Sequence, residues 1–138
     1  MSQPVRHIAM LVGALSLVAA SLAVPAFTQA SAATALTAAD TDKDGTLDLN
    51  EVKAAAALEF DKLDKDKDGT LDLKEAAHHV SKKNFVAADP DKDKTLSKDE
   101  YIALAVTLFK AANPDGDSTI DSKELYSTAG IELDRVIR

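Results

Sequence analysis

Large apolar residues recur along the chain with a period of 24 or 25 residues. Two series of four positions share this period: Leu36, Phe60, Phe85 and Phe109, and, 11 residues further on, Leu47, Leu71, Leu96 and Ile120. The stretches between the two series are polar and rich in aspartate. A fixed period of this length indicates copies of one supersecondary unit, so the pattern predicts four such units. A solvated or disordered acidic tract would need neither apolar series.

The intervals between the polar stretches are short and helix-forming. They cover Val52–Leu63, Ala76–Ala88 and Tyr101–Ala112. In the last interval Tyr101, Leu104, Ala105 and Leu108 follow the spacing of a half-buried helix. At 1.5 Å per residue each interval holds one helix of about 20 Å. One helix must therefore leave one polar stretch and enter the next.

These intervals predict an all-α fold. We expect a compact helical bundle of three helices, with four loops that share single connecting helices, followed by a short C-terminal element over Ser122–Arg138. If the shared helices are straight, neighbouring loops lie at opposite ends of a helix, which disfavours pairing between adjacent loops.

Each polar stretch has the form of the twelve-residue EF-hand calcium loop, D-x-D-x-D-G-x5-E. The four stretches are Asp40–Glu51, Asp64–Glu75, Asp89–Glu100 and Asn113–Glu124, here called loops 1 to 4. Position 6 favours glycine because the chain turns there with positive φ. Gly45 and Gly69 meet this demand, whereas Lys94 and Ser118 carry a cost of roughly 1–2 kcal/mol if the left-handed geometry is kept.

The loop pattern assigns the metal ligands by position. Positions 1, 3 and 5 offer side chains, position 7 its backbone carbonyl, position 9 a direct or water-mediated ligand, and position 12 a bidentate glutamate. The predicted metal residues are Asp40, Asp42, Asp44, Thr46, Asp48 and Glu51; Asp64, Asp66, Asp68, Thr70, Asp72 and Glu75; Asp89, Asp91, Asp93, Thr95, Ser97 and Glu100; and Asn113, Asp115, Asp117, Thr119, Asp121 and Glu124.

The loops differ in ligand charge. Loops 1 and 2 each offer five carboxylates, whereas Ser97 at position 9 and Asn113 at position 1 remove one from loops 3 and 4. We expect up to four ions, bound most strongly by loops 1 and 2 and least strongly by loop 4. Hard oxygen ligands suit Ca²⁺ or a lanthanide(III) ion, and the number of carboxylates alone does not decide between them.

The N-terminus has the pattern of a secretory signal peptide. Arg6 precedes an uncharged apolar run over Ile8–Val24, and Ala30-Ser31-Ala32 fits the small-residue cleavage rule. We expect a signal peptide over residues 1–32 and a four-EF-hand metal-binding domain over residues 33–138. An uncleaved membrane anchor is the alternative.

Composition and charge narrow the function classes. The 138 residues include no cysteine, which excludes disulfides and thiolate zinc sites. The net charge of −7 disfavours binding to nucleic acid and, after signal cleavage, to anionic membranes. After the predicted cleavage site the only histidines are the adjacent His78 and His79, and no nucleophile–base arrangement accompanies them, so we do not expect an enzyme. A calcium-responsive module with a Met-rich docking groove is disfavoured because both methionines lie in the predicted signal.

Crowded carboxylates also predict a folding response. Two unit charges 4 Å apart repel by about 4 kcal/mol at an effective dielectric of 20, and each loop contains several such pairs. A small helical core has a total stability of only about 5–15 kcal/mol. Metal binding is therefore expected to be coupled to folding.

Fused EF-hand loops behind a secretory signal resemble the lanmodulin family of periplasmic lanthanide-binding proteins. The similarity covers about Leu36–Arg138. Its most specific features are the fused period and a set of residues: Pro90 and Pro114 at position 2, Asp48, Asp72 and Asp121 at position 9, the segment 109–115, and the closing Ala129-Gly130 and Ile137-Arg138. Thr41 and Lys65 at position 2 and Ser97 at position 9 depart from the family pattern. The resemblance implies preference for lanthanide(III) over calcium, a periplasmic location, and a lanthanide-handling role beside a lanthanide-dependent dehydrogenase. A periplasmic calcium sensor or buffer is the alternative.

Overall fold

The structure, a computed structural model, describes residues 38–138. The predicted signal peptide, its cleavage site and Leu36 lie outside these residues. The described chain is mostly helical, with four two-residue strands. In order, the elements are β1 (Leu47–Asp48), α2 (Leu49–Leu63), β2 (Thr70–Leu71), α3 (Lys82–Ala88), β3 (Leu96–Ser97), α4 (Lys98–Ala112), β4 (Thr119–Ile120), α5 (Ser122–Leu125) and α6 (Thr128–Val136).

The two long helices begin at capping boxes. Asp48 caps α2: its side chain accepts the N–H of Glu51, and the Glu51 side chain accepts the N–H of Asp48. Ser97 and Glu100 make the same reciprocal arrangement at the start of α4. Each helix runs on to the first residue of the next loop. The expectation that one helix leaves one loop and enters the next is confirmed for these two intervals.

The prediction of a single helix over Ala76–Ala88 is wrong. Turns occupy residues 73–80, and α3 begins only after Ser81, whose side chain accepts the N–H of Asn84. The Ser81 side chain competes with the helix for a backbone N–H group, and as an N-cap it makes a new helix begin at the next residue. Val80 and Phe85 are both buried, so the broken segment folds back onto the core.

The break in this interval changes which loops pair. β2 of loop 2 pairs antiparallel with β3 of loop 3, with Leu71 opposite Leu96. β1 of loop 1 pairs antiparallel with β4 of loop 4, with Leu47 opposite Ile120. Loop 1 does not pair with loop 2 across α2, and loop 3 does not pair with loop 4 across α4, as expected for straight helices. Loops 2 and 3 pair although they are adjacent in the chain, because no straight helix separates them.

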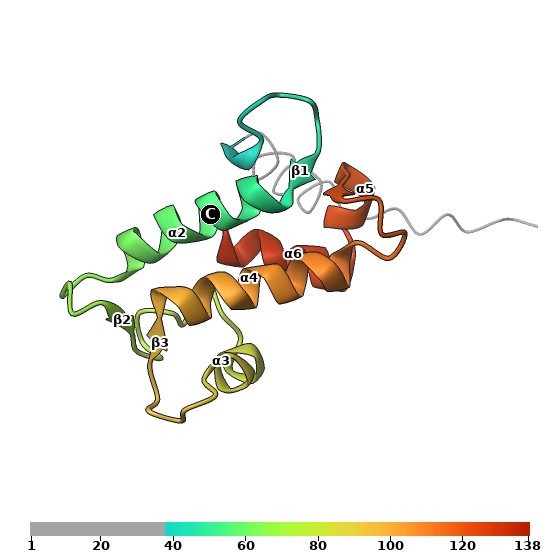
Figure 1. The fold of residues 1–138 in the computed structure, drawn as a ribbon. Helices are drawn as coiled ribbons and strands as arrows, with labels where there is room; N and C mark the ends of the chain where they lie inside the picture. The colour runs from blue at the N-terminus through green and yellow to red at the C-terminus, as the bar shows by residue number, and fades with distance from the viewer. Residues whose placement is uncertain (1–37) are drawn as a thin grey trace, which may run out of the picture.

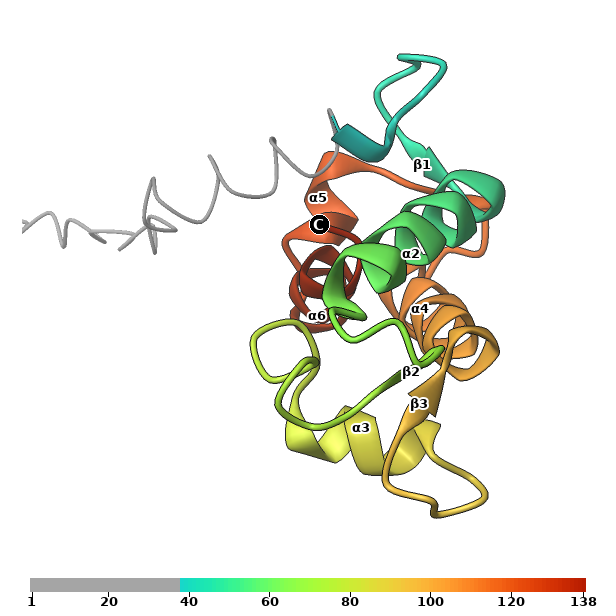
Figure 2. The same ribbon diagram turned by 90° about the vertical axis from the view of Figure 1, so that its left-hand side faces the viewer.

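The core forms around α4, which packs against both α2 and α6 (Figures 1 and 2). The third helix of the bundle is thus α6 rather than the interval after loop 2, and the C-terminal element is part of the core. Leu47, Leu71, Leu96 and Ile120 are fully buried, and Phe60, Phe85 and Phe109 are almost so. Both apolar series predicted from the sequence are confirmed wherever the structure describes them.

Tyr101 connects the three helices of the core. Its side chain is fully buried, its ring meets Phe60 edge to face at 5.9 Å between centroids, and its hydroxyl donates to the Val136 carbonyl at 2.8 Å. Burial, together with the charge of Glu59, raises the pKa of Tyr101 well above its ordinary value. Over residues 38–138, no helix is both long enough and apolar enough to cross a bilayer.

Candidate metal-binding loops

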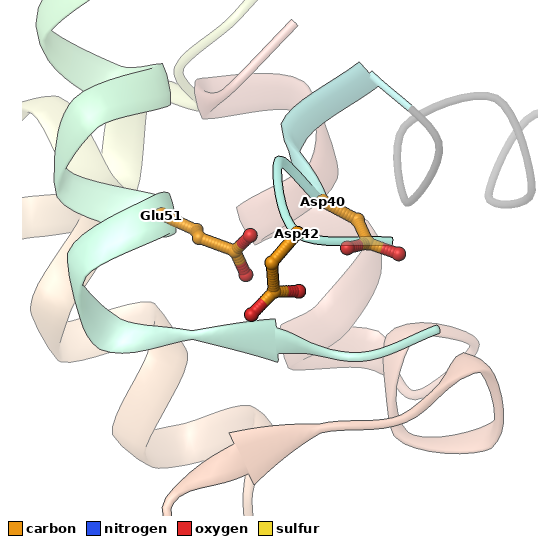
Figure 3. A group of neighbouring side chains, drawn as sticks. All are labelled: Asp40, Asp42 and Glu51. Carbon is orange, nitrogen blue, oxygen red and sulfur yellow. The ribbon is translucent and has the colours of Figure 1, made fainter. Parts of the chain in front are cut away.

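Three carboxylates meet in each of loops 1, 2 and 3. They come from positions 1, 3 and 12, with one oxygen of each carboxylate lying within 4.8 Å of the other two: Asp40, Asp42 and Glu51; Asp64, Asp66 and Glu75; Asp89, Asp91 and Glu100. Figure 3 shows Glu51 extending from the start of α2 toward Asp42, with Asp40 on the other side of Asp42. The structure therefore brings together residues that the sequence spacing predicts to share one cation.

Position 9 takes a structural role in this conformation. Asp48 Oδ1 accepts the N–H groups of Asn50 and Glu51 at 2.7 and 2.8 Å. Asp72, Ser97 and Asp121 make the corresponding bonds to the residue at position 12 of their own loops. The side chain predicted as a direct or water-mediated ligand thus holds the N–H at position 12 and orients the glutamate.

Position 5 is fixed by the residue at position 7. Asp44 Oδ1 accepts the Thr46 N–H at 2.8 Å and the Thr46 hydroxyl at 2.7 Å. The hydroxyl and then the N–H lower the pKa of Asp44 despite partial desolvation, which opposes them. The same pair of bonds recurs in the other loops, from Thr70 to Asp68, Thr95 to Asp93 and Thr119 to Asp117. The aspartate at position 5 is therefore held inside the loop by two hydrogen bonds from the threonine at position 7.

The aspartate at position 3 experiences the opposite electrostatic balance. A bond from the Asp44 N–H lowers the pKa of Asp42, but desolvation and the charges of Asp44 and Glu51 together outweigh it, so the pKa is raised. The pKa values of Asp66 and Asp91 are raised in the same way. Crowded negative charge is thus present at position 3 of all three clusters, and a bound cation would relieve it.

Three loop carboxylates contain a buried oxygen without a hydrogen-bond partner. These atoms are Oδ1 of Asp64, Oδ1 of Asp89 and Oε1 of Glu124. The Asp89 side chain belongs to a residue that is only 8% exposed, so water does not readily replace the missing partner. A buried anionic oxygen without a donor is costly, and a cation would supply what each lacks. The residues present therefore fit a hard metal ion.

Loop 4 differs from the other three. No cluster of three acidic side chains forms in it among the described residues, because position 1 is Asn113. The Asn113 Nδ2 group donates to the Thr119 carbonyl at 2.9 Å, and its Oδ1 accepts the Gly116 N–H at 2.6 Å. The carbonyl oxygen at position 7, which the loop pattern assigns as a metal ligand, thus accepts a hydrogen bond from the Asn113 amide instead. A metal ion at this carbonyl would have to displace the Asn113 amide.

Two positions in each loop have left-handed backbone. Position 6 does so at Gly45, Gly69, Lys94 and Ser118, with φ between 73° and 89°, as the sequence predicts. Position 4 does so as well, at Lys43, Lys67, Lys92 and Gly116, with φ between 59° and 70°. Left-handed backbone at position 4 was not predicted from the sequence, in which Gly116 of loop 4 is the one residue that hints at it.

Comparison with known families supports the loop assignment. The family model described as EF hand matches residues 33–55 and 57–75, which contain loops 1 and 2. No curated protein matches the chain. The family-model matches and the acidic clusters together support a metal-binding protein of the EF-hand type.

Proposed function

We propose that the chain binds lanthanide(III) ions through its EF-hand loops and that binding is coupled to folding. The observation that carries the proposal is the set of buried, unpartnered carboxylate oxygens at Asp64, Asp89 and Glu124. These atoms gain most from a cation of high charge, because each added unit of charge strengthens the attraction to a partly desolvated carboxylate. The resemblance to the lanmodulin family favours lanthanide over calcium.

The proposed ligands are the side chains at positions 1, 3, 5 and 12 and the carbonyl at position 7 of each loop. Position 9 supports them through its bond to the N–H at position 12. The EF-hand family is typically non-enzymatic, and a binding role uses the carboxylates without requiring a catalytic group.

Coupling to folding follows from the way the loops are joined. Leu47 pairs with Ile120 and Leu71 with Leu96, and all four side chains lie in the core. An ion that orders one loop therefore fixes the core residue of that loop. Through the strand pairing it also fixes the core residue of the paired loop. In loops 1, 3 and 4 the glutamate at position 12 also lies in the first turn of the helix that follows, so an ion bound to it would fix a helix start.

We further propose that the chain acts in the periplasm after removal of an N-terminal signal, beside proteins that use lanthanides. The basic, apolar and small-residue order of residues 1–32 supports secretion. A periplasmic calcium sensor or buffer would use the same loops and is the alternative.

One titration distinguishes these possibilities. Metal-free protein is titrated with lanthanum and separately with calcium, and helix content is followed by far-UV circular dichroism. We expect a large gain of helix with lanthanum at a lower free-ion concentration than with calcium. Equal midpoints would reject the lanthanide preference, and full helix before metal addition would reject coupled folding.

Glutamine at position 12 tests the ligand assignment. E75Q and E100Q each remove one ligand charge from a three-carboxylate cluster, so each is expected to lower the number of tightly bound ions by one. E132Q removes a carboxylate whose partners, Asn84 and Arg135, lie outside the loops, and it serves as the matched control. Unchanged stoichiometry in both glutamine variants would contradict the assignment.

A further inference from the structure

One pocket outside the metal loops has only basic residues in its lining. It has a volume of about 310 Å³ and is lined by His78, His79, Arg135 and Arg138. The two histidines come from the turns after loop 2, and the two arginines come from the C-terminal end of α6 and the residues that follow it. None of the four belongs to a predicted metal loop.

The distribution of residue types makes this pocket exceptional in the chain. Within residues 38–138, these four residues are all of the histidines and all of the arginines. Every other basic side chain in that range is a lysine. Arginine differs from lysine in its planar set of five N–H donors, which match the oxygens of a carboxylate, sulfate or phosphate. The chain therefore concentrates its multidentate donors at one place.

Buried carboxylates behind the pocket hold these donors in position. Arg138 Nε donates to Asp134 Oδ2 at 2.9 Å, and the Asp134 side chain is 5% exposed. His79 Nδ1 lies 3.0 Å from the Arg135 carbonyl oxygen and 3.7 Å from Oε1 of Glu59, whose side chain is 6% exposed. Both neighbours of Nδ1 are acceptors, so this nitrogen carries a proton, and Nε2 donates to an anion only when the imidazole is protonated on both nitrogens.

The arginines keep most of their donors. Arg138 uses Nε toward Asp134, and Arg135 uses Nη1 toward Glu132 Oε1 at 3.3 Å. Both guanidinium groups are about half exposed, which leaves the remaining N–H groups accessible. Three carboxylates, those of Glu59, Glu132 and Asp134, outnumber the two guanidinium groups. The arginine donors therefore supply geometry rather than net positive charge, and a ligand would bind weakly.

We propose that this pocket binds a small oxyanion, of the carboxylate or tetrahedral oxyacid class, between the guanidinium groups of Arg135 and Arg138. The ligand's oxygens accept N–H groups from both arginines, with His78 and His79 completing the wall. None of the four lining residues is a predicted metal ligand, so this site is separate from the metal loops.

Nuclear magnetic resonance of the arginine side chains tests the proposal. Isotope-labelled protein, freed of metal on a chelating resin and then kept in calcium chloride, is titrated with sodium sulfate and, in a second arm, with sodium acetate. Sodium chloride of equal ionic strength provides the reference. We expect saturable shifts of the Nε–H resonances of Arg135 and Arg138, with millimolar midpoints. Saturation by sulfate alone assigns a tetrahedral oxyanion, and saturation by acetate assigns a carboxylate.

Variants separate binding from general charge effects. R135Q and R138Q should each weaken sulfate or acetate binding by about fivefold or more, the loss of a charged hydrogen bond. K110Q removes the same charge from an exposed position on α4 and should leave the midpoint unchanged. R135K and R138K retain the charge and should still weaken binding if the planar donor set matters. Shifts no larger than those with chloride, or midpoints unchanged in both glutamine variants, would show that the arginines serve only their ion pairs with Glu132 and Asp134.

Discussion

The backbone N–H of Thr41 donates to Oε1 of Glu51 at 2.6 Å, and the Thr41 hydroxyl donates to the same oxygen at 2.9 Å. The N–H of Lys65 makes the corresponding bond to Glu75 in loop 2, at 3.2 Å. Position 2 thus supplies a donor that holds the glutamate at position 12 in these two loops. Loops 3 and 4 have proline at position 2, which has no N–H to give.

The missing donor has a visible consequence in loop 4. Oε1 of Glu124 is buried without a partner, while Oε2 accepts the Asp121 N–H at 3.0 Å. P114T would restore both donors that Thr41 supplies in loop 1. We expect it to raise the unfolding free energy of the metal-free protein by about 1 kcal/mol relative to the same substitution at Pro90, measured by urea denaturation.

P90T in loop 3 is the matched control for that prediction. Both variants lose the conformational restriction of proline, which costs about 0.4–1 kcal/mol. Glu100 has no buried oxygen without a partner, since Oε2 accepts both the N–H and the hydroxyl of Ser97 at 2.8 Å. Equal changes in P114T and P90T would contradict the role assigned to the position-2 donor.

A substitution at Asn113 is expected to lower the stability of the metal-free protein and to strengthen metal binding at loop 4. N113D removes the amide that donates to the Thr119 carbonyl and places a carboxylate beside that oxygen. We expect the metal-free protein to lose about 1–3 kcal/mol, the cost of leaving a polar group without its partner. Calorimetric titration with lanthanum should show tighter binding at loop 4, because the loop gains a fifth carboxylate and a freed carbonyl.

The opposite substitution at position 1 of loop 2, from aspartate to asparagine, is the comparison for N113D. D64N introduces an amide where Asp64 Oδ1 lacks a partner, and removes one ligand charge. We expect it to stabilise the metal-free protein and to weaken lanthanum binding. If both substitutions changed metal-free stability in the same direction, the amide would not be acting in place of a cation.

The sequence was sufficient for the repeated features of the fold. The period of 24 or 25 residues located the buried residues at loop position 8, and the intervals 52–63 and 101–112 became one helix each, because nothing in them competes with helical hydrogen bonds. The interval 76–88 contains Ser81, and its cap to Asn84 outweighed the helical pattern. That single break decides that loop 2 pairs with loop 3.

The site was predictable in its ligands but not in its hydrogen bonds. Spacing placed Asp40, Asp42 and Glu51 around one point. It did not reveal that Asp48 caps the helix, that Lys43 lies in left-handed backbone, or that Asn113 donates to a carbonyl. These features depend on which donor is nearest in three dimensions, and residue type alone leaves that open.

At Gly130, where α5 and α6 meet, the backbone leaves no room for a side chain. A Cβ atom at this position would overlap the Glu124 carbonyl oxygen and would lie 2.6 Å from the Leu125 carbonyl oxygen, both backbone atoms. We expect G130A to lower the unfolding free energy by about 1–3 kcal/mol, as overpacking does. Because Glu124 is position 12 of loop 4, lanthanum binding at that loop should weaken as well.

G116A separates steric crowding from backbone strain. A Cβ atom at Gly116 would meet nothing within 4 Å, but φ is +70° there. The expected cost is roughly 1–2 kcal/mol from left-handed geometry alone. A G130A variant that is as stable as the unmodified protein, when G116A is destabilised, would show that α5 and α6 separate without loss.

The buried carboxyl group of Asp134 is expected to make the unfolding free energy depend on pH in a way that does not involve the metal loops. Burial raises its pKa above 3.8, although the charges of Arg138 and Arg135 oppose this change, and Oδ1 has no hydrogen-bond partner. A carboxyl group whose pKa is higher in the folded state binds its proton more tightly there. Its ionisation therefore lowers the unfolding free energy as pH rises from 3.8 through the folded pKa, by about 1.4 kcal/mol for each pH unit that separates the folded from the unfolded pKa.

D134N removes this titration and retains the side-chain size. Relative to the unmodified protein, the variant should become progressively more stable as pH rises from 3.8 through the folded pKa of Asp134, and the difference should be constant at higher pH. Urea denaturation of both proteins at several pH values measures the difference. E132Q, which removes one carboxylate from a partly exposed position on the same helix, is measured in parallel as the control for the loss of one negative charge. A difference between D134N and the unmodified protein that stays constant across this range would mean that Asp134 titrates alike in the folded and unfolded chains.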